Sequence, residues 1–100
     1  MKVNDGMVPQ KARRAQFERD FKAAKARVRT RSGGMCEYPG DDCQRAATEC
    51  HHKLPRQHPR TNDPDFLLDL CSHHHHEVIH KYPEESYRQG WLLRWEDVPA

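Results

Sequence analysis

Residues 66–80 read FLLDLCSHHHHEVIH, and this stretch decides how the chain can fold. An apolar segment suited to a buried strand or a helical turn leads through Cys71 into four consecutive histidines. Ser72 is expected to be the N-cap of a helix over residues 73–82, which Pro83 would end. Thiol and imidazole groups at the start of a helix are typical of a metal site. Taken alone, the histidine run could equally be a solvated helix start.

The cysteines extend this pattern upstream. Cys36 and Cys43 enclose a turn marked by Pro39-Gly40, and Cys71 follows after 27 further residues. Two ligands on a turn and two at the start of a helix can converge on a tetrahedral Zn²⁺ site, which would stabilise the fold directly. The alternative is a set of unrelated thiols, because six intervening residues is a looser spacing than a Cys-x2-Cys knuckle. Cys50 is expected to be a small buried hydrophobic residue.

A second group of imidazoles is available. His51 and His52 lie in a short strand expected within residues 46–54, where neighbouring side chains point to opposite sides. His76 and His80 are four residues apart and would share one face of an α-helix. Three imidazoles with an open coordination position are typical of a catalytic metal site, and an unligated histidine nearby could act as a general base.

Composition limits the remaining possibilities. The chain has 100 residues, of which 35% are apolar, and a mean hydropathy of −1.12. One small domain with a thin core is expected, and such domains usually need a metal or disulfide staple. No apolar run could span a membrane, and the N-terminus lacks a secretory signal, so a cytoplasmic location is expected. Metal binding by the four cysteines is then favoured over disulfide pairing, which would be expected of a small secreted scaffold.

Charge separates the chain into two parts. Residues 1–31 contain ten Lys and Arg against three Asp and Glu, whereas all eight histidines follow. We expect a flexible terminus over residues 1–9 and a basic amphipathic helix over residues 10–31, with an apolar stripe formed by Phe17, Phe21, Ala24 and Val28. The basic face predicts contact with nucleic acid through Arg13, Arg14, Lys22, Lys25 and Arg29. The alternative is a helix that packs by its stripe while its charges are only solvated.

In combination, these motifs resemble an HNH endonuclease of the kind common in bacteriophages. The resemblance covers roughly 60 residues and is specific only in combination. It rests on Cys36 and Cys43, Ala46-Ala47-Thr48-Glu49, the run HHKLPR from His51 to Arg56, the run LLDLC from Leu67 to Cys71, the histidine cluster, Ile79-His80, Pro83 and Gly90-Trp91. It implies an α+β fold over residues 32–100, with a small ββα-metal core stapled by a zinc site and preceded by the basic helix.

The resemblance also assigns roles. His51, His76 and His80 would bind one catalytic divalent ion (Mg²⁺, Mn²⁺, Ni²⁺ or Zn²⁺), and His52 would be the general base. Arg56, with Lys53, would contact the phosphate. The structural Zn²⁺ would be held by Cys36, Cys43, Cys71 and His75. Counting forward from Cys71 would instead give His74 for zinc and His75 for the catalytic ion. Counting back from Ile79-His80 gives His75 for zinc and His76 for the catalytic ion. The second register is favoured because it keeps His76 and His80 four residues apart.

One departure concerns the family's middle asparagine, which falls on Phe66. Phe66 could mean a loosened catalytic loop, a substitute brace from Asp65 or Asn62, or reduced activity. The expected function is metal-dependent hydrolysis of DNA phosphodiester bonds in the cytoplasm of a bacterial host. The resemblance implies DNA as the substrate and a phage terminase as a partner during genome packaging. The alternative is a zinc-stapled module that binds DNA or protein without cutting.

Overall fold

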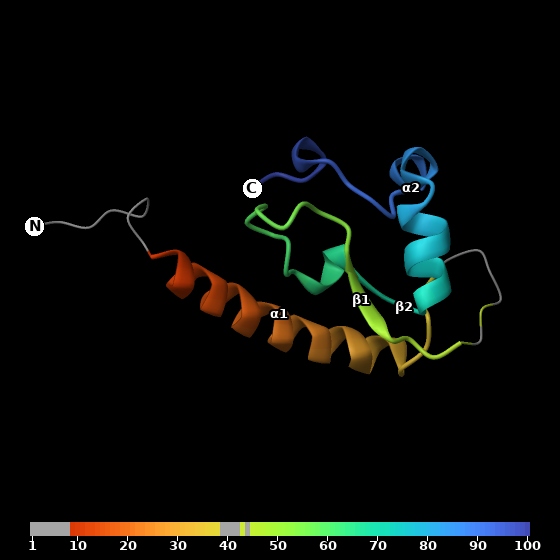
Figure 1. Ribbon diagram of the computed structural model, residues 1–100, viewed down its shortest axis with the longest axis horizontal. Coiled ribbons are helices and arrows are strands. Elements are labelled where there is room, and N and C mark those ends of the chain that lie inside the picture. The colour runs from red at the N-terminus through yellow and green to blue at the C-terminus, as the bar shows by residue number, and fades with distance from the viewer. Residues whose placement is uncertain (1–8, 39–42, 44) are drawn as a thin grey trace, which may run out of the picture.

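The computed structural model describes residues 9–38, 43 and 45–100. Its regular elements are α1 (Gln10–Ser32), β1 (Glu49–His52), β2 (Leu67–Leu70), η3 (His73–His80) and α2 (Pro83–Gln89), with short 3₁₀ turns η2 (Pro64–Phe66) and η4 (Trp95–Asp97). Helices with a two-stranded antiparallel sheet form a small α+β fold (Figure 1). Apart from Pro9, the terminus expected to be flexible lies outside the described residues, as does the Pro39-Gly40 turn.

The two strands form the centre of the fold. β1 pairs antiparallel with β2, so that Glu49 lies opposite Leu70 and His52 opposite Leu67. Side chains alternate along a strand, and each face of this hairpin therefore carries its own set of residues. A strand was expected within residues 46–54 and is found there, though shorter, and the segment before Cys71 is a strand rather than a helical turn.

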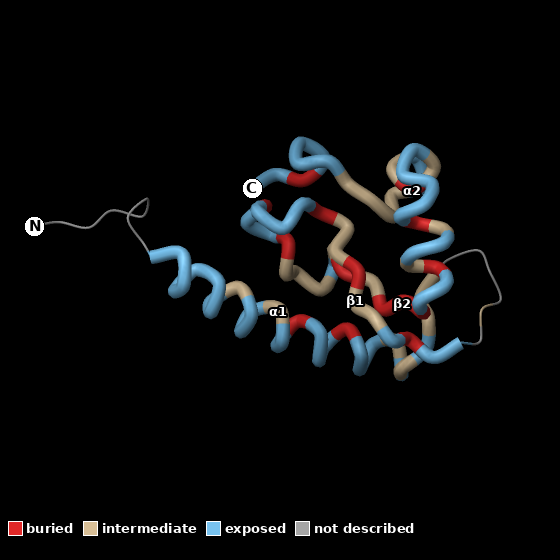
Figure 2. The backbone as a smooth tube through the Cα atoms, in the orientation of Figure 1, coloured by how far each residue is buried: buried red, intermediate tan, exposed pale blue. Residues whose placement is uncertain are grey.

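α1 covers one face of the hairpin. The segment contains neither Gly nor Pro until Gly33, whose φ of 65° ends the helix in the left-handed conformation. From the expected apolar stripe, Ala24 and Val28 are buried against Leu67, with Phe21 and Cys50 packed around them. Cys50 thus packs as a small hydrophobic residue, but it is half-buried and not fully buried as predicted. Figures 1 and 2 show α1 along one side of the hairpin, with its buried positions turned inward.

η3 covers the other face and differs from expectation in two ways. It is a π-helix rather than an α-helix, with buried His74 and Ile79. Ser72 takes the predicted position before the helix, but its side chain makes no capping hydrogen bond and its backbone angles are already helical (φ −57°, ψ −40°). Helical hydrogen bonding begins one residue earlier, where the His75 amide donates to the Cys71 carbonyl at 3.1 Å.

The C-terminal part completes the packing. α2 begins with Pro83 at its first position and ends at Gly90, which has a φ of 82°, as the sequence predicted. Residues 91–95, expected to be a strand or a packing tail, belong to no strand: the Leu93 amide donates to the Lys53 carbonyl, and η4 follows. Among the described helices, none is both long and apolar enough to cross a membrane.

Candidate metal centres

Three cysteines and one histidine meet beside the end of β2. Their ligand atoms, from Cys36, Cys43, Cys71 and His74, all lie within 4.8 Å of one another. The two sulfurs of Cys43 and Cys71 are 3.8 Å apart, and Nδ1 of His74 lies 3.4 Å from Sγ of Cys36. Two sulfurs bound to zinc at about 2.3 Å in a tetrahedral site would be separated by about 3.8 Å. This Cys3His group could therefore hold a metal ion such as zinc.

Local structure and electrostatics suit this role. Cys36 follows α1, and its amide donates to the Arg45 carbonyl at 3.0 Å, while Cys71 directly follows β2. Burial works against ionisation of Cys71, but hydrogen bonds from the His74 amide and the neighbouring thiols lower its pKa to about 6. A thiolate is the form that binds metal. All four cysteines are free, so the fold contains no disulfide scaffold.

The histidine of this group differs from the expected one. The register favoured from the sequence gave His75 as the fourth ligand, whereas the structure places His74 beside the cysteines. Tyr38 stacks on the His74 ring with centroids 4.2 Å apart and planes nearly parallel. The register counted forward from Cys71 is therefore the one in the structure, because the first helical turn follows Cys71 without a cap.

A second cluster forms between β1 and η3 from His51, His75 and His80, whose ligand atoms also lie within 4.8 Å of one another. The His75 and His80 ring centroids are 4.4 Å apart, and those of His51 and His75 are 5.2 Å apart. Here, too, His75 takes the place predicted for His76. A π-helix has i→i+5 hydrogen bonds and is wound more widely than an α-helix, so residues five apart, such as His75 and His80, can also lie near one face.

His51 is held as a neutral imidazole. Its side chain is buried, with 2% of the residue exposed, and this burial lowers its pKa to about 4. Nε2 lies 2.7 Å from the Trp91 carbonyl, to which it donates. The lone pair is therefore on Nδ1, which is the atom left for a metal. A carbonyl that fixes the tautomer and orientation of a ligand histidine is a common feature of metal sites.

Glu49 joins the same face, although it is not among the residues predicted to be functional. Its Oε1 accepts hydrogen bonds from Nδ1 of His75 and, at 2.8 Å, from Nε2 of His76. The bond from His75 is the main reason that the pKa of Glu49 is lowered. The signal for Glu49 was its position two residues before His51, since alternate residues of a strand share a face.

His52 and Arg56 lie elsewhere. The His52 ring packs on α1, with its centroid 4.4 Å from that of Phe21. Its Nε2 lies 2.9 Å from Oδ1 of Asn62, which was one of two residues named as a substitute brace. The Arg56 guanidinium lies over the Phe17 ring at 4.5 Å. The residues predicted as general base and phosphate contact are thus on the α1 face of the hairpin, away from His51, His75 and His80.

The predicted nucleic-acid contacts differ in their surroundings. Arg29 is bound to Asp69 by two hydrogen bonds of 2.6 and 3.0 Å, and burial lowers the pKa of half-buried Lys53. Lys25 lies over the Phe21 ring, and Lys22 is exposed. Arg13 and Arg14 line a groove with Arg56. The charges of Arg29 and Lys53 are therefore less available to an external phosphate than the others.

Comparison with known proteins adds no family to this geometry. A scan against protein-family models and searches of curated proteins and solved structures gave no match to the chain.

Proposed function

We propose that this protein is a metal-dependent endonuclease of the HNH type that hydrolyses DNA phosphodiester bonds. The observation that carries the proposal is the convergence of His51 from the first strand of the hairpin with His75 and His80 from the following helix. In this proposal β1, β2 and η3 form the ββα core. The Cys3His group binds the structural zinc.

The donor set fits a catalytic divalent ion. Three imidazoles leave coordination positions open for a phosphate oxygen and water, and they favour first-row transition metals over Mg²⁺. The ion would polarise the scissile phosphate and stabilise charge on the leaving oxygen. The Trp91 carbonyl and the Glu49 carboxylate orient His51 and His75, respectively, so that both rings are positioned before any substrate arrives.

The proposed hydrolysis also needs a side chain that accepts a proton from water. His52 was predicted for this role, but its ring packs on α1. The His76 side chain is 52% exposed, and its ring lies 4.7 Å from that of His75; its Nε2 lies 2.8 Å from Oε1 of Glu49, and a hydrogen bond donated there leaves Nδ1 as the basic nitrogen. A carboxylate–imidazole pair of this kind is a common general base. We therefore propose that His76, and not His52, is the general base that accepts the proton from water.

Nicking of supercoiled plasmid tests the proposal. The zinc-loaded protein should nick DNA at low salt with at least one of Mn²⁺, Ni²⁺, Zn²⁺ or Mg²⁺, and His80→Ala should abolish nicking while zinc content is unchanged. His76→Gln should reduce the rate by about 100-fold or more, whereas His52→Gln should retain most of it. The reverse order for the last two variants would restore His52 as the base.

A second candidate is a zinc-stapled module that binds DNA or protein without cutting. Phe66, at the position of the family asparagine, favours it. If the protein still holds zinc and binds DNA but nicks it with none of these ions at several pH values, the result would support this module.

A further inference from the structure

The α1 face of the hairpin carries a continuous row of rings and cations that the cleavage proposal does not use. Along the row, Arg56 lies over Phe17, and Lys25 lies over Phe21, at 4.5 and 4.6 Å from the ring centroids. The His52 ring lies between the two phenylalanines, 5.8 Å from Phe17 and 4.4 Å from Phe21. We call these five side chains the aromatic row. Its rings are half-buried, and Lys25 and Arg56 are exposed.

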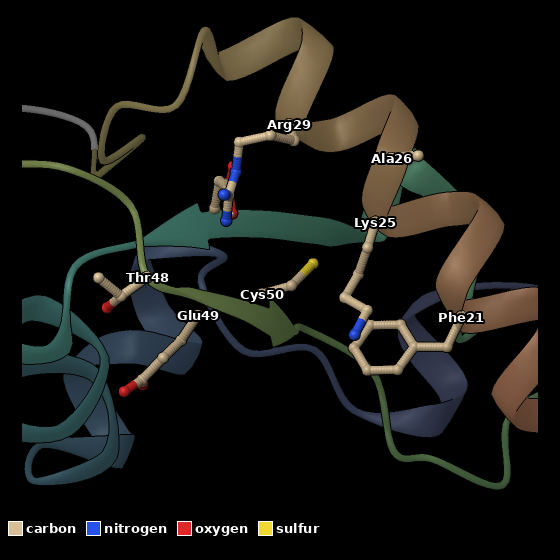
Figure 3. Close-up of a pocket in the computed structure, with 8 residues that line it drawn as sticks. Phe21, Lys25, Ala26, Arg29, Thr48, Glu49 and Cys50 are labelled. Carbon is tan, nitrogen blue, oxygen red and sulfur yellow. The ribbon is translucent and has the colours of Figure 1, made fainter.

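A hollow adjoins each end of the row. The one beside Phe21 has a volume of about 510 Å³ and lies between α1 and β1, with Lys25 and Cys50 in its lining. Figure 3 shows the Lys25 ammonium group beside the Phe21 ring and the Cys50 sulfur pointing toward α1, while Glu49 points away. The other hollow, of about 540 Å³, lies beside Phe17 and is lined by Arg13, Arg14 and Arg56.

This chemistry fits one class of partner. The exposed part of each half-buried ring can stack with a nucleobase, and the cations that lie over the rings can contact the phosphates of the same strand. α1 as a whole carries nine Lys and Arg residues against two acidic ones, which favours a polyanion. In a duplex the base faces are stacked on one another, so only an unpaired strand can offer them to the row.

We propose that the aromatic row binds single-stranded DNA, at a surface separate from the metal cluster on the opposite face of the hairpin. The proposal extends the expected contact of α1 with DNA by naming the form of DNA that is bound. It does not depend on cleavage, because no residue of the His51, His75 and His80 cluster takes part.

Fluorescence anisotropy with the full, zinc-loaded chain tests it. The probes are a labelled oligothymidine of about 12 nucleotides and a duplex of equal length. The single strand should bind more tightly than the duplex, and Phe17→Leu and Phe21→Leu should each weaken single-strand binding about fivefold or more. Lys25→Gln should weaken it and reduce its salt dependence.

The chain offers a matched control in Lys81, which lies over the Tyr82 ring between η3 and α2, away from α1. Lys81→Gln removes the same charge from the same kind of ring contact and should leave binding unchanged. If circular dichroism shows that a leucine variant is unfolded, the Lys25→Gln and Arg56→Gln variants, at exposed positions, test the proposal instead. Equal affinity for the duplex, or binding that Lys25→Gln and Lys81→Gln weaken alike, would overturn the proposal.

Discussion

At the scale of single residues, Asp69 shows how a buried carboxylate ties two elements together. It is 2% exposed, and it accepts hydrogen bonds from Arg29 and, at 2.7 Å, from the hydroxyl of Ser32. Burial alone would raise its pKa, but these bonds hold the pKa below its usual value. The end of α1 is therefore fastened to β2 by charge as well as by apolar packing.

Asp69→Asn should lower the free energy of unfolding by about 2 kcal/mol, because hydrogen bonds to a charged group are lost at a buried position. Urea unfolding monitored by tryptophan fluorescence measures the change. Asp65→Asn is the matched control, since Asp65 is exposed, and it should have an effect within about 0.5 kcal/mol. Equal effects from both substitutions would contradict the role given to Asp69.

The neighbouring histidines His74 and His75 should separate the two metal groups. His74→Ala should lose the zinc and the folded state, because His74 contacts Cys36 and Cys71. His75→Ala should keep both and lose only the binding of a second ion at His51 and His80. Metal content after gel filtration, together with circular dichroism, measures this. Zinc loss from His75→Ala but not from His74→Ala would restore the register favoured by the sequence.

At the scale of elements, the π-helix resolves a conflict within the sequence. Counted forward from Cys71, the resemblance implies His74 and His75 as ligands, but counted back from Ile79-His80 it implies His75 and His76. The wider winding of η3 brings a residue five positions before His80 to the same side, so that His75 faces the cluster together with His80. Periodicity could not predict this, because the favoured i, i+4 pair assumes an α-helix.

Deletion of Glu77 tests this explanation. The deletion places the two ligand histidines four residues apart, where an α-helix also brings them to one face. We expect the shortened protein to bind a Co²⁺ or Ni²⁺ ion at this cluster with an affinity within about tenfold of the full chain, as measured by calorimetry on zinc-loaded protein. Complete loss of that binding in a folded variant would show that the π-helix itself is required.

The other elements were predictable to different degrees. α1 was predictable because Gly- and Pro-free sequence, helix-forming residues and a spaced apolar stripe all agree. α2 was bounded by Pro83 and Gly90, whose backbone preferences are strong. The strands are four residues long, and such short apolar runs give no period that separates strand from turn. Their pairing had to come from the structure.

At the scale of the whole molecule, the packing leaves little stability to spare. Among the described residues, the apolar core cluster consists of Ala24, Val28 and Leu67, with Phe21 and Cys50 packed around it. The Cys3His group joins the segment after α1 to the end of β2 and the start of η3. A metal bound there would link all three parts of the fold, which a cluster of this size cannot do by burial alone.

Removal of metal should therefore unfold the domain. Chelation at neutral pH should abolish the cooperative thermal transition, and readdition of Zn²⁺ should restore it. Near-ultraviolet circular dichroism follows the change, because Trp91 packs against Tyr38, which stacks on His74. His80→Ala serves as the control, since it should leave the transition in place. An unchanged transition in the chelated protein would contradict a structural role for the Cys3His group.

The candidate sites were predictable in kind but not in detail. The residue types and their spacing indicated a cysteine-rich group and a histidine group, and the structure brings both groups together. The sequence could not show that the His52 ring packs on Phe21, because the partner comes from a helix about 30 residues earlier. It also could not show that Trp91 orients His51, because that contact is made by a backbone carbonyl.

The alternation along β1 has a consequence for how this chain can vary. Odd-numbered Glu49 and His51 serve the histidine cluster, whereas even-numbered Cys50 and His52 serve α1. Gain or loss of one residue within this strand would move its later side chains to the opposite face and damage both surfaces in a single event. Homologous chains should therefore differ in length there by an even number or not at all, while the loop between the strands should accept insertions of any parity.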